Sequence, residues 1–186
     1  MMIKVALLLA EGFEEAEAIT PVDLMRRARI DCVTVSLTEE RLVPSSRHIP
    51  ILADKSFDEM DFDSCDGVVL PGGLAGTERL MADARVEALL RRFGEAGKLT
   101  AAICAAPTVL AKAGLLEGKR AICYPGLEDR LSGAETCCES VVCDGNVITS
   151  RGMGTSVPFG LALVAYYLGK EKADALAAKI VYRSAD

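Results

Sequence analysis

The chain has 186 residues, of which 51% are hydrophobic and 26% charged, and its formal net charge is −6 at pH 7. This length and apolar content predict one folded domain over residues 1–186 and exclude intrinsic disorder. The acidic balance argues against nucleic acid or an acidic membrane surface as a partner, because both attract basic proteins.

The seven cysteines predict a reduced, cytoplasmic protein. Their number is odd, they form no CxxC pair, and the apolar run at residues 5–10 is followed too soon by glutamates to be a signal peptide. We expect no metal, because the cysteines at residues 137–143 lack the spacing of zinc ligands and the only histidine is the distant His48. The longest apolar stretch, residues 157–168, is too short to span a bilayer and predicts a buried helix.

Strand-like apolar runs and helical apolar spacing alternate along the chain. Strands are expected over residues 3–9, 32–37, 67–70, 99–103 and 120–123. Helices are expected over residues 14–28, 86–93, 155–168 and 171–181. Within the first helix Pro21 should cause a kink or a restart. Polar residues 39–50 predict a loop or an edge hairpin, and residues 136–142 and 147–150 flank a hairpin turn at Asp144-Gly145-Asn146.

This alternation predicts an α/β fold with a mostly parallel sheet, helices on both faces and a small edge hairpin. Parallel sheets bind ligands at the carboxyl ends of their strands. Three segments should therefore lie together at that edge, namely residues 11–17, 71–76 and 104–106.

Cys104 occupies the most informative position among these segments. It follows the strand at residues 99–103 and precedes a helical run, with Pro107 in the first helical turn and Gly114 at the C-cap. A thiol at such a corner feels the positive end of the helix dipole, which favours its thiolate. The pattern indicates a nucleophilic or redox-active cysteine, and the alternative is a buried structural cysteine.

Backbone and carboxyl groups near Cys104 suggest further roles. Gly72 and Gly73 let the backbone approach a ligand, and their N–H groups with that of Ala105 would form an oxyanion hole. The alternative for the two glycines is a plain tight turn. A partly buried Glu17 beside the sulfur would have a raised pKa and would shuttle a proton, whereas the alternative is a solvated glutamate at a helix start.

Five motifs together resemble one family, in family order and over essentially the whole chain. They are AEGFEEAE at residues 10–17, PVDLMRR at 21–27, VLPGG at 69–73, AAICAAP at 101–107 and TSRGMGTS at 149–156. They resemble the PfpI/ThiJ superfamily, in the branch of the parkinsonism-associated protein deglycase and bacterial YajL. The resemblance implies a flavodoxin-like three-layer sandwich and a homodimer.

The resemblance also implies roles for individual residues. Cys104 would be the nucleophilic, oxidation-prone cysteine and Glu17 its carboxyl partner, with backbone N–H groups from Gly73 and Ala105. Arg27 and Arg47 match arginines near the pocket and the dimer interface, where they would attract anions, and Asp23 would be an interface or core residue.

The chain departs from the family pattern at two positions. Tyr124 stands on the pocket wall where some members carry a histidine, so any mechanism that needs a Cys–His pair is in doubt; His48 is expected to be a surface residue. Met153 replaces a frequent proline. The resemblance still implies a glyoxalase or protein deglycase without a cofactor, acting on 2-oxoaldehydes such as methylglyoxal or on glycated proteins. The alternative is an oxidative-stress sensor or redox-regulated chaperone that uses the same cysteine.

Overall fold

The computed structural model describes residues 2–183 and contains a central sheet of seven strands in the order β10-β11-β7-β6-β1-β2-β5. All neighbouring strands are parallel except β10 and β11, which form an antiparallel pair. The strands are β1 (Lys4–Leu9), β2 (Asp31–Ser36), β5 (Lys55–Ser56), β6 (Gly67–Leu70), β7 (Leu99–Ile103), β10 (Val141–Asp144) and β11 (Val147–Ser150). Strands β1, β6 and β7 are apolar almost throughout and buried, as expected for strands that are covered on both faces.

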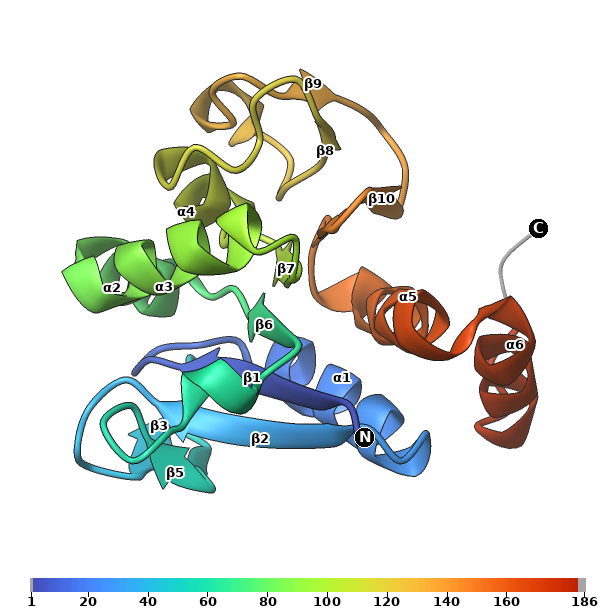
Figure 1. The fold of residues 1–186 in the computed structure, drawn as a ribbon, viewed down its shortest axis with the longest axis horizontal. Coiled ribbons are helices and arrows are strands. Elements are labelled where there is room, and N and C mark those ends of the chain that lie inside the picture. Colours follow the sequence, from blue (N-terminus) through green and yellow to red (C-terminus); the bar gives the residue numbers. More distant parts are fainter. Residues whose placement is uncertain (1, 184–186) are drawn as a thin grey trace.

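Helices cover both faces of this sheet (Figure 1). One face packs against α2 (Leu74–Ala82), α3 (Ala84–Glu95) and α4 (Pro107–Lys112). The other face packs against α1 (Glu15–Arg27), α5 (Ser156–Leu168) and α6 (Lys170–Lys179). Alternate residues of β1 serve the two cores, because successive side chains of a strand point to opposite faces. The predicted α/β three-layer architecture is confirmed.

Two small sheets lie outside the central one. Strands β3 (Leu42–Pro44) and β4 (Pro50–Leu52) form an antiparallel hairpin, as predicted for residues 39–50. Strands β8 (Arg120–Ala121) and β9 (Glu135–Thr136) pair with each other in parallel.

Several expectations need correction. The helix α1 runs through Pro21 without a restart. The strand predicted at 120–123 has two residues and pairs with β9, outside the central sheet. The predicted run 136–142 is divided between β9 and β10, so the hairpin with β11 begins at Val141. The sequence pattern also failed to predict α2 and the two-residue strand β5.

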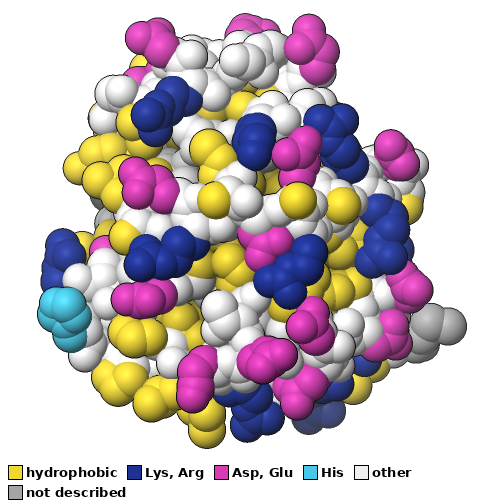
Figure 2. All heavy atoms as spheres, turned by 90° about the vertical axis from the view of Figure 1, so that its left-hand side faces the viewer, with side chains coloured by type: hydrophobic (Ala, Val, Ile, Leu, Met, Phe, Trp, Pro, Cys, Tyr) yellow, Lys and Arg dark blue, Asp and Glu magenta, His cyan; other side chains and the backbone are white. Residues whose placement is uncertain are grey.

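The chain order changes direction at β1. From β1 the chain passes to β2 on one side, then returns to β6 on the other side and continues to β7. In open α/β sheets such a switch point, at the carboxyl ends of the strands, is the usual ligand site. Figure 2 shows the face on the left of Figure 1, where charged side chains of both signs border exposed apolar ones.

Candidate functional site

Cys104 lies at the corner between β7 and α4, as the sequence predicted. Its backbone is left-handed, with a φ of 65°. Its N–H donates to the carbonyl of Ser150 at 2.9 Å, and its carbonyl accepts from the N–H of Tyr124 at 2.7 Å. The corner is thus held by β11 on one side and by the segment after β8 on the other.

The sulfur of Cys104 has three polar neighbours. It is hydrogen-bonded to the carboxyl group of Glu17, from the first turn of α1, and to the N–H groups of Gly73 and Ala105. These two N–H groups come from the loop after β6 and from the elbow itself. The structure therefore brings Cys104, Glu17, Gly73 and Ala105 together at the switch point.

Gly72 has a different position from the one expected for an oxyanion-hole residue. Its N–H already donates to Oε2 of Glu17 at 2.9 Å, and its carbonyl accepts from Glu14 at 2.9 Å. The prediction that this N–H faces a substrate is therefore wrong, because the Glu17 carboxylate uses it. A Cβ on Gly72 would lie 2.5 Å from both the Cβ of Cys104 and Oε2 of Glu17, so the close approach of the two side chains requires glycine.

Burial sets the protonation of Glu17. Its side chain is 1% exposed, and this desolvation raises its pKa to about 7, although the hydrogen bonds from Cys104 and Gly72 act in the opposite direction. The nearby charge of Glu14 raises the pKa further. Glu17 is therefore a carboxyl group that gains and loses a proton near neutral pH.

Cys104 differs from the expectation of a thiolate stabilised by a helix dipole. Burial raises its pKa to about 12, and the negative charge of Glu17 contributes to the increase. The N–H groups of Gly73 and Ala105 lower the pKa but do not offset these effects. The helix also begins only at Pro107, so its first turn does not include the cysteine. A proton on Glu17 removes the opposing charge, so the thiol and the carboxyl together share one proton above neutral pH.

The sulfur borders a cavity of about 520 Å³. Tyr124, which is 53% exposed, forms part of its wall, as predicted. Arg47 also lines it, and the guanidinium of this residue has one hydrogen bond, to the carbonyl of Ser46 at 3.4 Å. Among residues 2–183 this arginine has no ion-pair partner within 4 Å, so its charge is available to an anionic group.

Arg27, for which the resemblance implies a place near the pocket and the dimer interface, does not line this cavity within one chain. It lies in the last turn of α1, where its Nε donates to Asp23 at 2.7 Å, and it borders a separate hollow near α6. Glu17 and Arg27 are ten residues apart on one helix, which corresponds to roughly 15 Å. Asp23 is exposed and forms this ion pair within one chain.

The cavity has further polar lining that the sequence pattern did not assign to it. His48 is exposed, as expected, yet it borders the cavity from the β3–β4 hairpin, where its φ is 60°. The hairpin is held against the site because Ser46 donates from its hydroxyl to Glu14 at 2.9 Å and to Glu15 at 3.0 Å. Arg79 of α2 lines the cavity and pairs with Glu11 at 3.6 Å. These contacts join segments far apart in sequence, so no local pattern reveals them.

Residues 2–183 show neither a metal-binding cluster nor a helix that spans a membrane. In that range, His, Cys, Asp and Glu side chains nowhere gather in groups of three or more that could hold a metal ion. None of the helices there is both long enough and apolar enough to cross a bilayer.

Known proteins resemble this chain over most of its length. The sequence profile of the DJ-1/PfpI family matches residues 3–166. Protein dj-1beta of Drosophila melanogaster is 43% identical over 172 residues, which are 91% of this chain and 92% of that protein. A Pyrococcus abyssi protein named a deglycase is 34% identical over 155 residues, covering 82% of this chain and 92% of that protein.

Solved structures have the same fold. The crystal structure of Drosophila DJ-1beta superposes with a TM-score of 0.94 at 40% identity, covering 99% of this chain and all of that one. The structure of oxidized Toxoplasma gondii DJ-1 has a TM-score of 0.93 at 33% identity, covering 98% of this chain and all of that one.

Some relatives are longer. The chain matches DJ-1 homologs A and B of Arabidopsis thaliana at 42% and 38% identity, over 89% and 88% of its own length, but it spans only 42% and 38% of theirs. The match to the family profile, the identity to relatives of similar length and the shared fold lead to one conclusion: the chain belongs to the DJ-1/PfpI family.

Proposed function

We propose that the chain is a cofactor-independent glyoxalase or deglycase that acts on 2-oxoaldehydes such as methylglyoxal, or on their adducts with protein amino groups. The observation that carries the proposal is the pair formed by Cys104 and Glu17. The two side chains are hydrogen-bonded, Cys104 lines an open cavity, and the carboxyl group of the buried Glu17 titrates near neutral pH. The deglycase name of the Pyrococcus relative supports the same activity.

The reaction begins when the thiol of Cys104 adds to the aldehyde carbon of methylglyoxal and gives a hemithioacetal. The sulfur's proton passes to the Glu17 carboxylate as the carbon–sulfur bond forms. Glu17 then gives this proton to the substrate oxygen, which completes the hemithioacetal and restores the carboxylate. The N–H groups of Gly73 and Ala105 stabilise the negative charge that develops on the substrate oxygen.

Glu17 then moves a proton from one carbon to the next through an enediol, because a carboxyl with a pKa near 7 both accepts and donates protons at neutral pH. The product of this transfer is a thioester of lactate on Cys104. Water hydrolyses the thioester, releases lactate and restores the thiol. On the hemiaminal that methylglyoxal forms with an amino group, the thiol replaces the amine at the same carbon. The carbon–nitrogen bond breaks, the amine leaves with the sulfur's proton, and the resulting hemithioacetal follows the same steps to lactate.

The cavity sets which molecules reach the sulfur. Arg47 would attract a carboxylate or another anion on the substrate, and Tyr124 would contact its apolar part. A cavity of about 520 Å³ is larger than methylglyoxal requires and is within the range that accepts larger ligands. A homodimer and a cytoplasmic location belong to the same proposal and come from the family resemblance.

The test is lactate production from methylglyoxal by the wild-type chain, Cys104→Ser and Glu17→Gln. We expect Cys104→Ser to lose at least about 1000-fold in kcat/KM, since it lacks the nucleophile. Glu17→Gln keeps a hydrogen-bond donor toward the sulfur but cannot move protons, so a loss of about 100-fold or more is expected. Cys143→Ser, at an exposed cysteine of β10, serves as the matched control. Full turnover by Cys104→Ser would refute the mechanism.

A second candidate function, redox sensing, is favoured by the contacts of the same sulfur. Two molecules of hydrogen peroxide would oxidise the thiol to sulfinate with release of two waters. The sulfinate oxygens would accept from Gly73, Ala105 and protonated Glu17. The Toxoplasma relative was solved in an oxidized form. Intact mass after mild peroxide separates the candidates: a two-oxygen addition that is absent in Cys104→Ser, without lactate production by the wild type, would favour sensing.

A further inference from the structure

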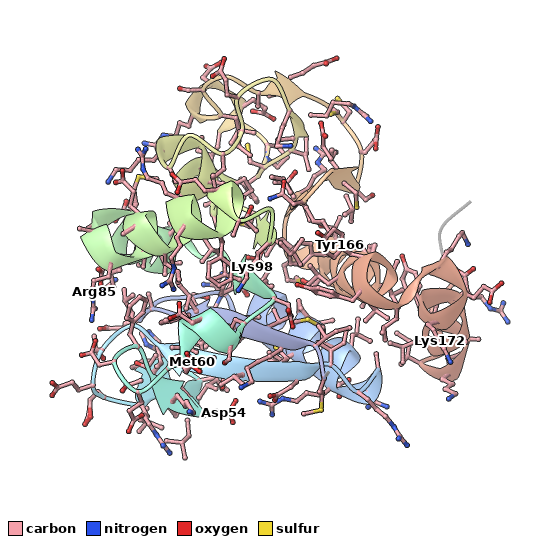
Figure 3. The ribbon with its side chains drawn as sticks, viewed as in Figure 1. Asp54, Met60, Arg85, Lys98, Tyr166 and Lys172 are labelled. Atoms are coloured by element: carbon pink, nitrogen blue, oxygen red, sulfur yellow. The ribbon has the colours of Figure 1, made fainter. Side chains whose placement is uncertain are left out.

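A second hollow lies between the C-terminal end of α1 and the helix α6, away from Cys104. It has a volume of about 440 Å³, and its floor includes Leu168 and Leu176. The helix α5 packs against both α1 and α6, and its last residue, Leu168, lines the hollow together with residues of α6 and of the end of α1. Figure 3 shows Lys172 on α6, one of the residues that line this hollow.

The charge of this hollow is uniformly positive. Arg27, Arg29, Lys172 and Lys179 line it, and no Asp or Glu does. Arg27 forms an ion pair with Asp23, whereas the other three cations have no carboxylate within 4 Å among residues 2–183. In a chain with a net charge of −6, these four cations, three of them without an ion-pair partner, concentrate positive charge at the hollow.

The positions of three of these cations follow from the end of α1 and from the residue spacing along α6. Arg29 has a φ of 63°, a left-handed conformation in which glycine is favoured, directly after the end of α1. It also borders a neighbouring hollow of mixed charge, where Asp31, Asp54 and Asp61 offset the lysines and Arg26. On α6, Lys172, Leu176 and Lys179 are separated by four and three residues, so they share one face of the helix. That face presents two ammonium groups on either side of an apolar centre.

We propose that this hollow binds a small organic polyanion that carries phosphate groups and an apolar part. Guanidinium groups match the oxygens of phosphate with two N–H donors, and lysines add point charges. The volume fits a small ligand and is too small for a long peptide segment. The leucines of the floor would contact the apolar part. The site is independent of the proposed enzyme activity, since Arg27 is roughly 15 Å along α1 from Glu17.

The test is calorimetric titration of the full chain with inorganic pyrophosphate at low ionic strength. We expect Arg29→Gly and Lys172→Gln each to weaken pyrophosphate binding at least about fivefold, as for the loss of one phosphate-contacting cation. Arg29→Gly is informative because glycine favours the local backbone, so its melting temperature should equal or exceed that of the wild type. Phenyl phosphate should bind more tightly than inorganic phosphate, and equal affinities would refute the contact between the ligand and the leucines.

Two control variants distinguish binding in this hollow from binding elsewhere on the chain. Lys170→Gln removes a lysine of α6 that does not line the hollow, and Arg47→Gln removes the free cation of the Cys104 cavity. Both should bind pyrophosphate as the wild type does. Equal weakening of pyrophosphate binding by Lys170→Gln would show diffuse charge attraction, and loss of binding in Arg47→Gln would place the anion beside Cys104. Absence of binding to the wild type would show that the hollow is no anion site. Each of these results would overturn the proposal.

Discussion

The carboxyl groups at the two ends of helix α1 have pKa values that are shifted in opposite directions. Glu17, in the first turn, is buried and accepts one backbone N–H, and its pKa is raised to about 7. Asp54 forms an ion pair with Arg26 in the last turn of α1, and the distance from Arg26 Nη2 to Asp54 Oδ2 is 2.5 Å. Burial tends to raise the pKa of Asp54 too, but hydrogen bonds from Thr34 and the charge of Arg26 hold it below its usual value. Figure 3 places Asp54 beside the lower strands.

The difference shows what determines whether an acid is reactive or structural here. Asp54 accepts from the N–H and the hydroxyl of Thr34 at 2.8 and 2.7 Å and also from a guanidinium, so its ionised form is stabilised. Glu17 has a thiol and one N–H as hydrogen-bond partners but no cation. Desolvation therefore outweighs the hydrogen bonds, and the raised pKa keeps the carboxyl group partly protonated near neutral pH. Glu17 is suited to proton transfer because it has fewer hydrogen-bond donors than Asp54 and no neighbouring cation.

Among variants that keep both Cys104 and Glu17, the largest effect is expected from Gly72→Ala, which disturbs the environment of Glu17. The new Cβ would lie 2.5 Å from Glu17 Oε2 and from Cys104 Cβ, so one of the two side chains must move. We expect kcat/KM for methylglyoxal to fall at least about 100-fold, because small displacements of reacting groups are costly. Gly154→Ala, where nothing lies within 4 Å of the added Cβ, should retain activity. Equal activity of both variants would contradict the geometry.

The pH dependence of stability tests the raised pKa of Glu17. Its folded pKa of about 7 exceeds the ordinary value of 4.5, so the native state holds the extra proton between these values. The stabilisation is complete below about pH 4.5 and is lost as pH rises through 7, a decrease of about 3 kcal/mol in the free energy of unfolding. Glu17→Gln should remove this decrease in urea unfolding at pH 5 and 8. An unchanged slope would show that Glu17 is ionised throughout.

A smaller effect of opposite sign is expected at Asp54. Its lowered pKa means that the stabilisation is present above the ordinary value of 3.8 and is lost as pH falls through the folded pKa. Since the side chain is 43% exposed, Asp54→Asn should lower the free energy of unfolding by about 1 kcal/mol or less at pH 7. Thermal melts of the wild type and of Asp54→Asn at pH 7 and in strong acid provide the check. The difference in melting temperature should vanish in acid, and a difference that persists there would indicate an effect of packing instead.

The smallest effect concerns the wall of the Cys104 cavity. Tyr124→His introduces an imidazole near Cys104 and Glu17, which have no histidine beside them in the native chain. We expect a severalfold rise in kcat/KM for methylglyoxal. This is below the factor of about 100 that a well-positioned acid–base group contributes, since neighbouring side chains have not been adjusted to it. The pH profile of kcat/KM provides the check, because a new basic limb should accompany the increase. A loss of activity would show that the tyrosine itself contacts substrate.

Local signals were sufficient for most of the fold. The strand before Cys104, Pro107 at the helix start and Gly114 after the helix end all act through neighbouring residues, and the elbow formed as predicted. The helix α2 was not predicted, because the residue before its start at Leu74 is Gly73, which provides no side-chain cap. The strand β8 was misplaced because its pairing with residues 135–136 depends on a contact distant in sequence.

The candidate site shows the same division. Cys104 stood out from its own sequence neighbours, whereas Glu17 needed the resemblance to a family. The direction of the Gly72 N–H and the place of His48 depend on how separate loops fold together. Arg27 was assigned from a motif, and the motif does not state which hollow its side chain borders. The pKa of the thiol also required the structure, since burial outweighed the helix-end effect.

The left-handed backbone of Cys104 has a consequence for how sequences can drift. A non-glycine residue in this conformation costs about 1 to 2 kcal/mol, so replacement by glycine would relieve strain and give a more stable chain without a thiol. Selection for stability alone would therefore favour loss of the cysteine. A lineage that no longer needed the reaction would discard this residue early, and directed evolution for heat tolerance should be screened for that substitution.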